Sequence, residues 1–162
     1  MPSVIARGWW WRAFSWVISR KPLTLFFMHL ATWLDRPLMR ISEGRWRLSF
    51  VIPVLLMRCV GAKTGQVREV PLLFVPNGDT PLVIASNGGR SRHPAWCHNL
   101  RKHPEITCTF DGSSRRYRAE ELTGVARERA WHQAVALYPG YARYATRAER
   151  TIPLFLLRPL VG

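Results

Sequence analysis

Short apolar runs separated by polar turns make up the chain after about residue 50. The runs are rich in Val, Ile, Leu and Phe, and Asp111-Gly112 between two of them is a strong hairpin signal. The pattern predicts strands over Val51–Val60, Val67–Val75, Pro81–Ser86, Glu105–Phe110, Ser114–Glu121 and Thr151–Arg158. Six short strands in one small domain favour a mainly antiparallel β-barrel.

Two helices are predicted to flank these strands. His93–Lys102 has a proline near its start and two basic residues at its end, where the helix dipole favours cations. Apolar residues recur at helical spacing between Ala130 and Tyr138, which predicts a helix of about a dozen residues. The barrel and its flanking helices together predict the α+β class.

The amino-terminal part has a different pattern. Aromatic residues crowd Trp9–Trp16, and an apolar run, Leu23–Leu34, follows Pro22. We predict two short helices broken at Pro22, and divide the chain into an amphipathic segment, residues 1–34, and a barrel domain, residues 35–162. The apolar run is shorter than the ~20 residues of a spanning helix, and no signal-peptide cleavage site follows it. We therefore expect a cytoplasmic protein.

Tryptophan-rich apolar faces interleaved with arginine suit the interface of an anionic membrane. The same aromatic residues would equally well pack on the barrel or between two chains of an oligomer. Peripheral attachment to the inner face of the cell membrane and a homodimer therefore both stay open.

The chain is strongly basic, with 24 Lys and Arg against 10 Asp and Glu and a formal net charge of +14. This balance favours an anionic partner such as nucleic acid, anionic lipid or a phosphorylated cofactor. The basic residues are spread along the chain without a nucleic-acid-binding motif, so no nucleic acid is expected. Cysteine and histidine spacings fit no metal site, and the fingerprints of ATP sites, NAD sites and serine hydrolases are absent.

Two turns could hold an anionic, ring-containing ligand. The loop from Gly61 to Gln66, with Lys63 and Arg68, offers cations and backbone N–H groups to a phosphate or carboxylate, although an ordinary basic turn would look the same. Ala85–Gly89 ends a strand in a tight turn that a planar ring could approach. Three tyrosines at positions 138, 141 and 144 would line a wall with hydroxyls or would simply pack beneath the helix.

These motifs stand in one order along the chain: Gly61-Ala62-Lys63-Thr64-Gly65, Arg68, Val70-Pro71-Leu72, Ala85-Ser86-Asn87-Gly88-Gly89, His93-Pro94-Ala95-Trp96, Asn99-Leu100, Tyr138-Pro139-Gly140-Tyr141 and Ile152-Pro153. From about Asp35 to Pro159 the chain thereby resembles the deazaflavin-dependent nitroreductase family. The resemblance implies a split β-barrel that binds coenzyme F420. It also implies a reductase that passes hydride from reduced F420 to a quinone, an enone or a nitroaromatic compound.

The resemblance also assigns site residues by position. Those on the phosphate side are Ala62, Lys63, Thr64, Arg68, Glu69 and Val70. Those that border the deazaflavin ring are Ala85, Ser86, Asn87, Ala95, Trp96, Cys97, His98 and Asn99, with Tyr141 completing the pocket. Candidates for orienting or protonating the acceptor are Ser86, Tyr138, Tyr141 and Tyr144. Ala62 stands where the family commonly has arginine, which puts the strength of F420 binding in question.

Two other functions stay open: a noncatalytic barrel that holds a lipid or a flavin-like ligand, and a basic membrane-surface protein. The retained Lys63, Thr64 and Arg68 favour F420. The sequence does not identify the physiological acceptor.

The membrane hypothesis makes a prediction for the amino-terminal segment. Full-length protein should float with vesicles that contain anionic lipid, whereas a chain that begins at Arg36 should remain at the bottom of the gradient, because it lacks the tryptophan-rich faces. Equal flotation of the two chains would exclude the membrane role.

Overall fold

The computed structural model describes residues 53–160. The two helices expected around Pro22, the tryptophan-rich faces and the division after residue 34 lie outside the described residues. The description begins inside the first predicted strand.

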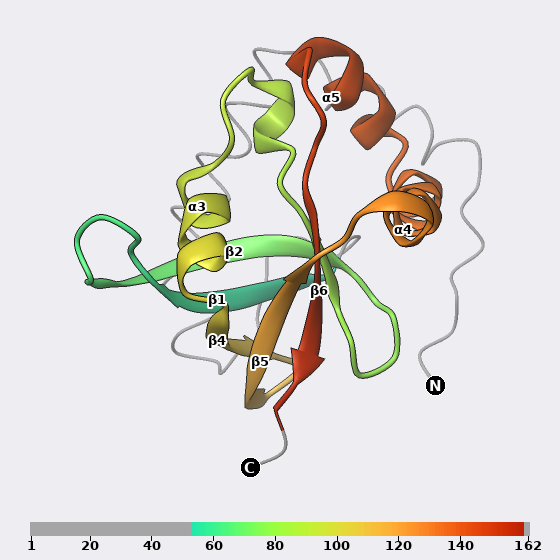
Figure 1. Ribbon diagram of the computed structural model, residues 1–162. Helices are drawn as coiled ribbons and strands as arrows, with labels where there is room; N and C mark the ends of the chain where they lie inside the picture. The colour runs from blue at the N-terminus through green and yellow to red at the C-terminus, as the bar shows by residue number, and fades with distance from the viewer. Residues whose placement is uncertain (1–52, 161–162) are drawn as a thin grey trace.

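Six strands form a closed barrel in the order β1-β2-β3-β6-β5-β4, and every neighbouring pair is antiparallel (Figure 1). The strands are β1 Val54–Val60, β2 Val67–Val75, β3 Leu82–Ile84, β4 Glu105–Phe110, β5 Ser113–Glu121 and β6 Leu154–Pro159. The predicted barrel is confirmed. β3 is shorter than predicted because the chain turns at Ser86, whose N–H donates to the carbonyl of Ile84.

Alternate residues of each strand fill the barrel, as expected for a period of two. The side chains inside include Leu55, Met57, Val83, Ile106, Tyr117, Phe155 and Leu157, all with at most 4% of their surface exposed. Packed side chains rather than a channel therefore occupy the barrel interior.

β1 and β4 pair over a short length. Their ladder covers Leu56–Arg58 against Thr107–Thr109, whereas β1 pairs with β2 along its whole length. Beyond Arg58 and Thr107 the two strands are no longer paired, so the wall of the barrel opens there.

Helices lie outside the barrel: the 3-10 helix η1 Asn87–Gly89, α3 Ala95–Lys102, α4 Gly124–Leu137 and α5 Gly140–Ala148. The predicted helix around Ala130–Tyr138 is α4, but α5 was not predicted. Tyr138 precedes a proline and has extended backbone angles, which ends α4. Gly140 then lets α5 begin against the Tyr138 ring, which a Cβ would overlap.

α4 and α5 pack on the outer side of β3 and β6 and form a second core with Leu82, Ile84 and Leu154. Among residues 53–160, no helix is long and apolar enough to cross a membrane. The same residues contain no cluster of three or more His, Cys, Asp or Glu side chains able to hold a metal ion.

Two strand valines test how much the barrel interior contributes to stability. Val83 is 0% exposed inside the barrel and Val67 is 56% exposed. Val83→Ala should lower the free energy of unfolding by about 2 kcal/mol, because it deletes buried methyl groups and leaves a cavity. The matched Val67→Ala should change it by less than about 0.5 kcal/mol. Equal losses in urea unfolding would contradict this account.

Candidate cofactor-binding site

The β1–β2 hairpin loop is fastened to α3. The Ala62 N–H donates to Asn99 Oδ1 at 2.9 Å, and Lys102 Nζ donates to the Ala62 carbonyl at 2.7 Å. Asn99 is buried, and its Nδ2 lies 3.6 Å from the Sγ of Cys59 on β1. Both backbone polar groups of Ala62 are thus held by side chains of one helix.

Short-range contacts shape the rest of this loop. The Gly61 N–H donates to the Gln66 carbonyl at 2.8 Å, and the Gly65 N–H donates to the Gly61 carbonyl at 2.9 Å. Gly65 has φ +68°, a conformation that favours glycine. Lys63, Thr64 and Arg68 are exposed, so the fastened loop presents two cations and a hydroxyl to solvent.

Glu69 and Val70 follow on β2. Glu69 is partly buried and lies 3.5 Å from Arg58 Nε, while Val70 packs against the barrel core. Neither side chain extends the exposed cationic surface of the loop, so any contact to a phosphate there would come from backbone atoms.

α3 is itself fixed to the barrel. Arg101 makes two hydrogen bonds to the Glu121 carboxylate, at 2.8 and 2.7 Å, which lower the pKa of that carboxyl. Trp96 and Cys97 are buried, with the Trp96 ring 5.9 Å from that of Phe155. Ala95 and His98 are exposed. The helix therefore offers one exposed face while its other face anchors it.

The turn after β3 has an unusual backbone. Asn87, Gly88 and Gly89 have φ values of 51°, 63° and 77°, three left-handed residues in succession. The Asn87 amide donates to the Arg92 carbonyl at 2.9 Å, and Ala85 and Ser86 are buried beneath the turn. A Cβ on Gly89 would lie 3.1 Å from the Tyr144 Cα, so the turn packs closely on α5.

Arg150, which no sequence motif marks, holds this turn. Its Nη2 lies 3.2 Å from the Ala85 carbonyl oxygen and 3.3 Å from those of Ser86 and Arg92. Its Nε donates to the Arg90 carbonyl at 3.1 Å. An arginine next to Ile152-Pro153 carries no signal of this role in the sequence, because its partners are about sixty positions away.

The three tyrosines assigned to the acceptor lie in the second core. Tyr138, Tyr141 and Tyr144 are each no more than 5% exposed, and the hydroxyls of Tyr138 and Tyr144 are 3.0 Å apart. Burial raises the pKa of Tyr141, and the neighbouring Tyr138 raises it further. Their rings contact one another edge to face or tilted. This placement is the packing role that their spacing also allowed; a catalytic role stays a prediction.

The structure brings most of the remaining candidates onto one side of the barrel. In Figure 1, α3 lies between the β1–β2 hairpin and the turn at Asn87–Gly89, and α5 covers that turn. The cationic loop, α3 and the left-handed turn therefore lie on one side of the barrel, and α5, which carries Tyr141 and Tyr144, packs on the turn.

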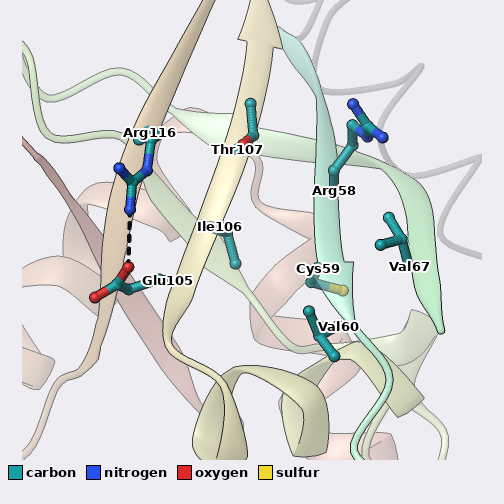
Figure 2. A pocket seen from close by; sticks show the side chains of 8 residues that line it. All are labelled: Arg58, Cys59, Val60, Val67, Glu105, Ile106, Thr107 and Arg116. Atoms are coloured by element: carbon teal, nitrogen blue, oxygen red, sulfur yellow. Dashed lines mark hydrogen bonds and ion pairs between the residues drawn. The ribbon is translucent and has the colours of Figure 1, made fainter. Parts of the chain in front are cut away.

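A separate cavity of about 380 Å³ lies at the opening between β1 and β4 (Figure 2). It is lined by Arg58, Cys59, Val60, Val67, Glu105, Ile106, Thr107 and Arg116. None of the candidate site residues lines it, although Val60 and Val67 stand at the base of the cationic loop.

Cys59, Cys97 and Cys108 are buried free thiols, and burial raises the pKa of Cys108 to about 12. This high pKa disfavours a thiolate nucleophile.

The protein is thus a small antiparallel six-stranded barrel with flanking helices and an exposed cationic hairpin. Residues 36–159 match the family of F420H(2)-dependent quinone reductases. The chain belongs to this family, which confirms the resemblance to deazaflavin-dependent reductases.

Relatives of known name or structure agree with this assignment. A protein of Mycobacterium tuberculosis named F420H(2)-dependent quinone reductase is 34% identical over 92 residues, which are 49% of this chain and 62% of that protein. The chain thus spans less than two thirds of the length of this relative. A solved structure described as an F420-H2 dependent reductase has 36% identity and a TM-score of 0.61, over 65% of this chain and 94% of its own. Another, described as a domain-swapped dimer, has 33% identity and a TM-score of 0.64, over 78% and 97%.

The attachment of the hairpin to α3 can be tested at Asn99. Asn99→Leu keeps the branched shape of the side chain but leaves the Ala62 N–H without its acceptor, so the free energy of unfolding should fall by roughly 1–3 kcal/mol. Amide exchange at Ala62 should accelerate. Asn77→Leu is the matched control, since Asn77 is exposed and its bond to Thr80 is replaceable by water. Unchanged exchange at Ala62 would show that Asn99 does not hold the loop.

Proposed function

We propose that this chain is a reductase that binds reduced F420 and delivers its hydride to a quinone or a related electron-poor acceptor. Membership of the quinone reductase family supports the reaction class. The single structural observation that carries the proposal is the cationic hairpin loop fastened to α3 by Asn99 and Lys102.

The residues present fit an anionic cofactor that carries a planar ring. Lys63 is exposed on a loop whose backbone is held by hydrogen bonds, and Arg68 is exposed at the start of β2, so binding a phosphate there requires little further ordering. Arg68 Nη2 donates to Gln66 Oε1 at 2.9 Å, which orients the guanidinium along the loop. No acidic side chain stands within residues 61–68, so the loop meets a phosphate with net positive charge.

The ring would lie against the exposed parts of the turn and of α3. Ala85, Ser86 and Asn87, which the family resemblance assigns to the ring, begin this turn; Asn87 is partly exposed, whereas Ala85 and Ser86 are buried. Ala95 and His98 offer the exposed face of the helix, whereas Trp96, Cys97 and Asn99 support it from within. We propose that Asn87, Ala95 and His98 contact the ring, whereas Trp96, Cys97 and Asn99 hold the helix in place from within.

Reduced F420, when bound, supplies the hydride, so the protein supplies alignment, exclusion of water and a proton. Reduction of a quinone to a hydroquinone takes up one hydride and one proton. Ser86 is the proposed group that orients the acceptor, because it begins the turn at which the ring would lie. Ser86 is 8% exposed, and Tyr138, Tyr141 and Tyr144, at 4–5%, pack against one another in the second core, so they are the second set of candidates for this role.

A homodimer forms part of this proposal. The related structure described as a domain-swapped dimer supports it, since that protein has 33% identity to this chain. Light scattering coupled to size exclusion would measure the mass in solution.

Fluorescence titration with F420, followed by oxidation of reduced F420 in the presence of menadione, tests the proposed function. We expect saturable binding and turnover with menadione. Binding without turnover on menadione, cyclohexenone or a nitroaromatic compound would contradict the reductase and favour a noncatalytic barrel. Absence of binding would contradict the cofactor assignment.

Lys63→Ala combined with Arg68→Ala should raise the Kd for F420 about tenfold or more, since two charge-assisted contacts are lost. The fold should stay intact, because both side chains are exposed. The matched control, Arg115→Ala with Arg129→Ala, removes the same charge from exposed positions on β5 and α4. An equal loss of affinity in both variants would indicate attraction by net charge instead of a phosphate site.

A further inference from the structure

The turn that follows β3 requires an unusual amount of support. Asn87, Gly88 and Gly89 are left-handed in succession, and for the asparagine this conformation costs free energy. Within the turn, the Gly89 N–H donates to the Ser86 carbonyl at 3.0 Å and the Arg90 N–H to the Asn87 carbonyl at 3.2 Å. These two bonds leave other carbonyls of the segment to find donors elsewhere.

Arg150 provides those donors. Its guanidinium contacts the carbonyl oxygens of Ala85, Ser86, Arg90 and Arg92, and its Nη1 lies 3.3 Å from that of Thr151. A planar guanidinium carries five N–H groups in fixed directions, so one side chain can serve carbonyls that converge from several points. A lysine ammonium has three donors on one atom and could not reach all of these oxygens at once.

The charge of Arg150 matters as well as its geometry. The negative ends of five backbone dipoles meet at this point, and a cation offsets their mutual repulsion. Without the guanidinium, the Ser86 and Arg92 carbonyls would keep the bonds from the Gly89 N–H and the Asn87 amide, but the carbonyl of buried Ala85 would lose the Arg150 donor, which costs more than the loss of an exposed hydrogen bond.

The fold brings Arg150 to the turn by way of α5. The helix ends at Ala148, and Glu149 adopts φ +52° before the chain reaches Arg150. α5 also packs on the turn directly, since Gly89 approaches the backbone of Tyr144. The turn is therefore held both by α5 and by Arg150, two residues beyond the end of that helix.

We propose that Arg150 is a positioning residue of the cofactor site: it holds Ala85–Asn87 in the conformation that receives the deazaflavin ring, without contacting the ring itself. This inference rests on the proposed function, in which the ring lies against the turn that Ala85–Asn87 begin. It adds a residue outside that assignment and a physical cause for the shape of the turn.

Arg150→Met and Arg150→Lys test the inference together. Arg150→Met keeps the length and apolar stem of the side chain but removes every donor. We expect the Kd for F420 to rise about tenfold, equivalent to about 1.4 kcal/mol of binding free energy, and amide exchange to accelerate selectively in residues 85–92. Arg150→Lys should recover part of the affinity, because it restores the charge and some of the donors.

Arg158→Met is the matched control, because Arg158 is exposed on β6 and pairs with Glu120. It should leave both the Kd and exchange in residues 85–92 unchanged. Exchange that accelerates throughout the barrel in Arg150→Met, or that stays unchanged in residues 85–92, would overturn the positioning role. So would faster exchange of the turn with an unchanged Kd.

The two proposals fail in different ways. If wild-type protein does not bind F420, the proposed function fails, and the cofactor role of Arg150 fails with it. If wild-type protein binds F420 and Arg150→Met binds equally well, only the present inference is overturned. The inference is supported if Arg150→Met weakens F420 binding and accelerates amide exchange selectively in residues 85–92, and if Arg150→Lys recovers part of the affinity.

Discussion

The antiparallel pairing of β3 with β6 is the constraint on which the rest of the structure depends. It joins Leu82–Ile84 to Leu154–Leu156, segments about seventy positions apart, and closes the barrel. Val83 and Phe155 face the barrel interior, whereas Ile84 and Leu154 face the second core. The same two strands thus form a wall shared by both cores, so loss of their pairing would open the barrel and detach α4 and α5 together.

This pairing also creates the candidate site. The chain leaves β3 into the left-handed turn and enters β6 from the segment that carries Arg150, so antiparallel pairing places these two stretches side by side. The hydrogen bond from Ala85 to Pro153 continues the contact beyond the ladder. The guanidinium of Arg150, which follows α5, therefore reaches the carbonyl oxygens of Ala85 and Ser86, which follow β3. The site is built at the point where the barrel closes.

The cationic hairpin depends on a second long-range contact. Its turns are local, since Gly61 and Gly65 bond within the loop, but its direction is set by Asn99 and Lys102 on α3. α3 in turn is fixed to β5 through Arg101 and Glu121. Lys63 and Arg68 therefore occupy defined positions without any buried contact of their own, which leaves their charges free to meet an anion.

The sequence by itself determined the strands and the class of fold, because alternation of period two, a hairpin signal at Asp111-Gly112 and glycines at turns are local properties. It also carried the ordered motifs by which the family is identified.

Only the tertiary structure decided that Tyr138 ends one helix before another begins, and that Tyr138, Tyr141 and Tyr144 pack in a second core. It alone decided that Asn99 holds Ala62 and that Arg150 holds the turn at Ser86. These contacts join residues 37 to 65 positions apart. Such residues become neighbours only when the barrel closes, so no local sequence pattern identifies them as partners.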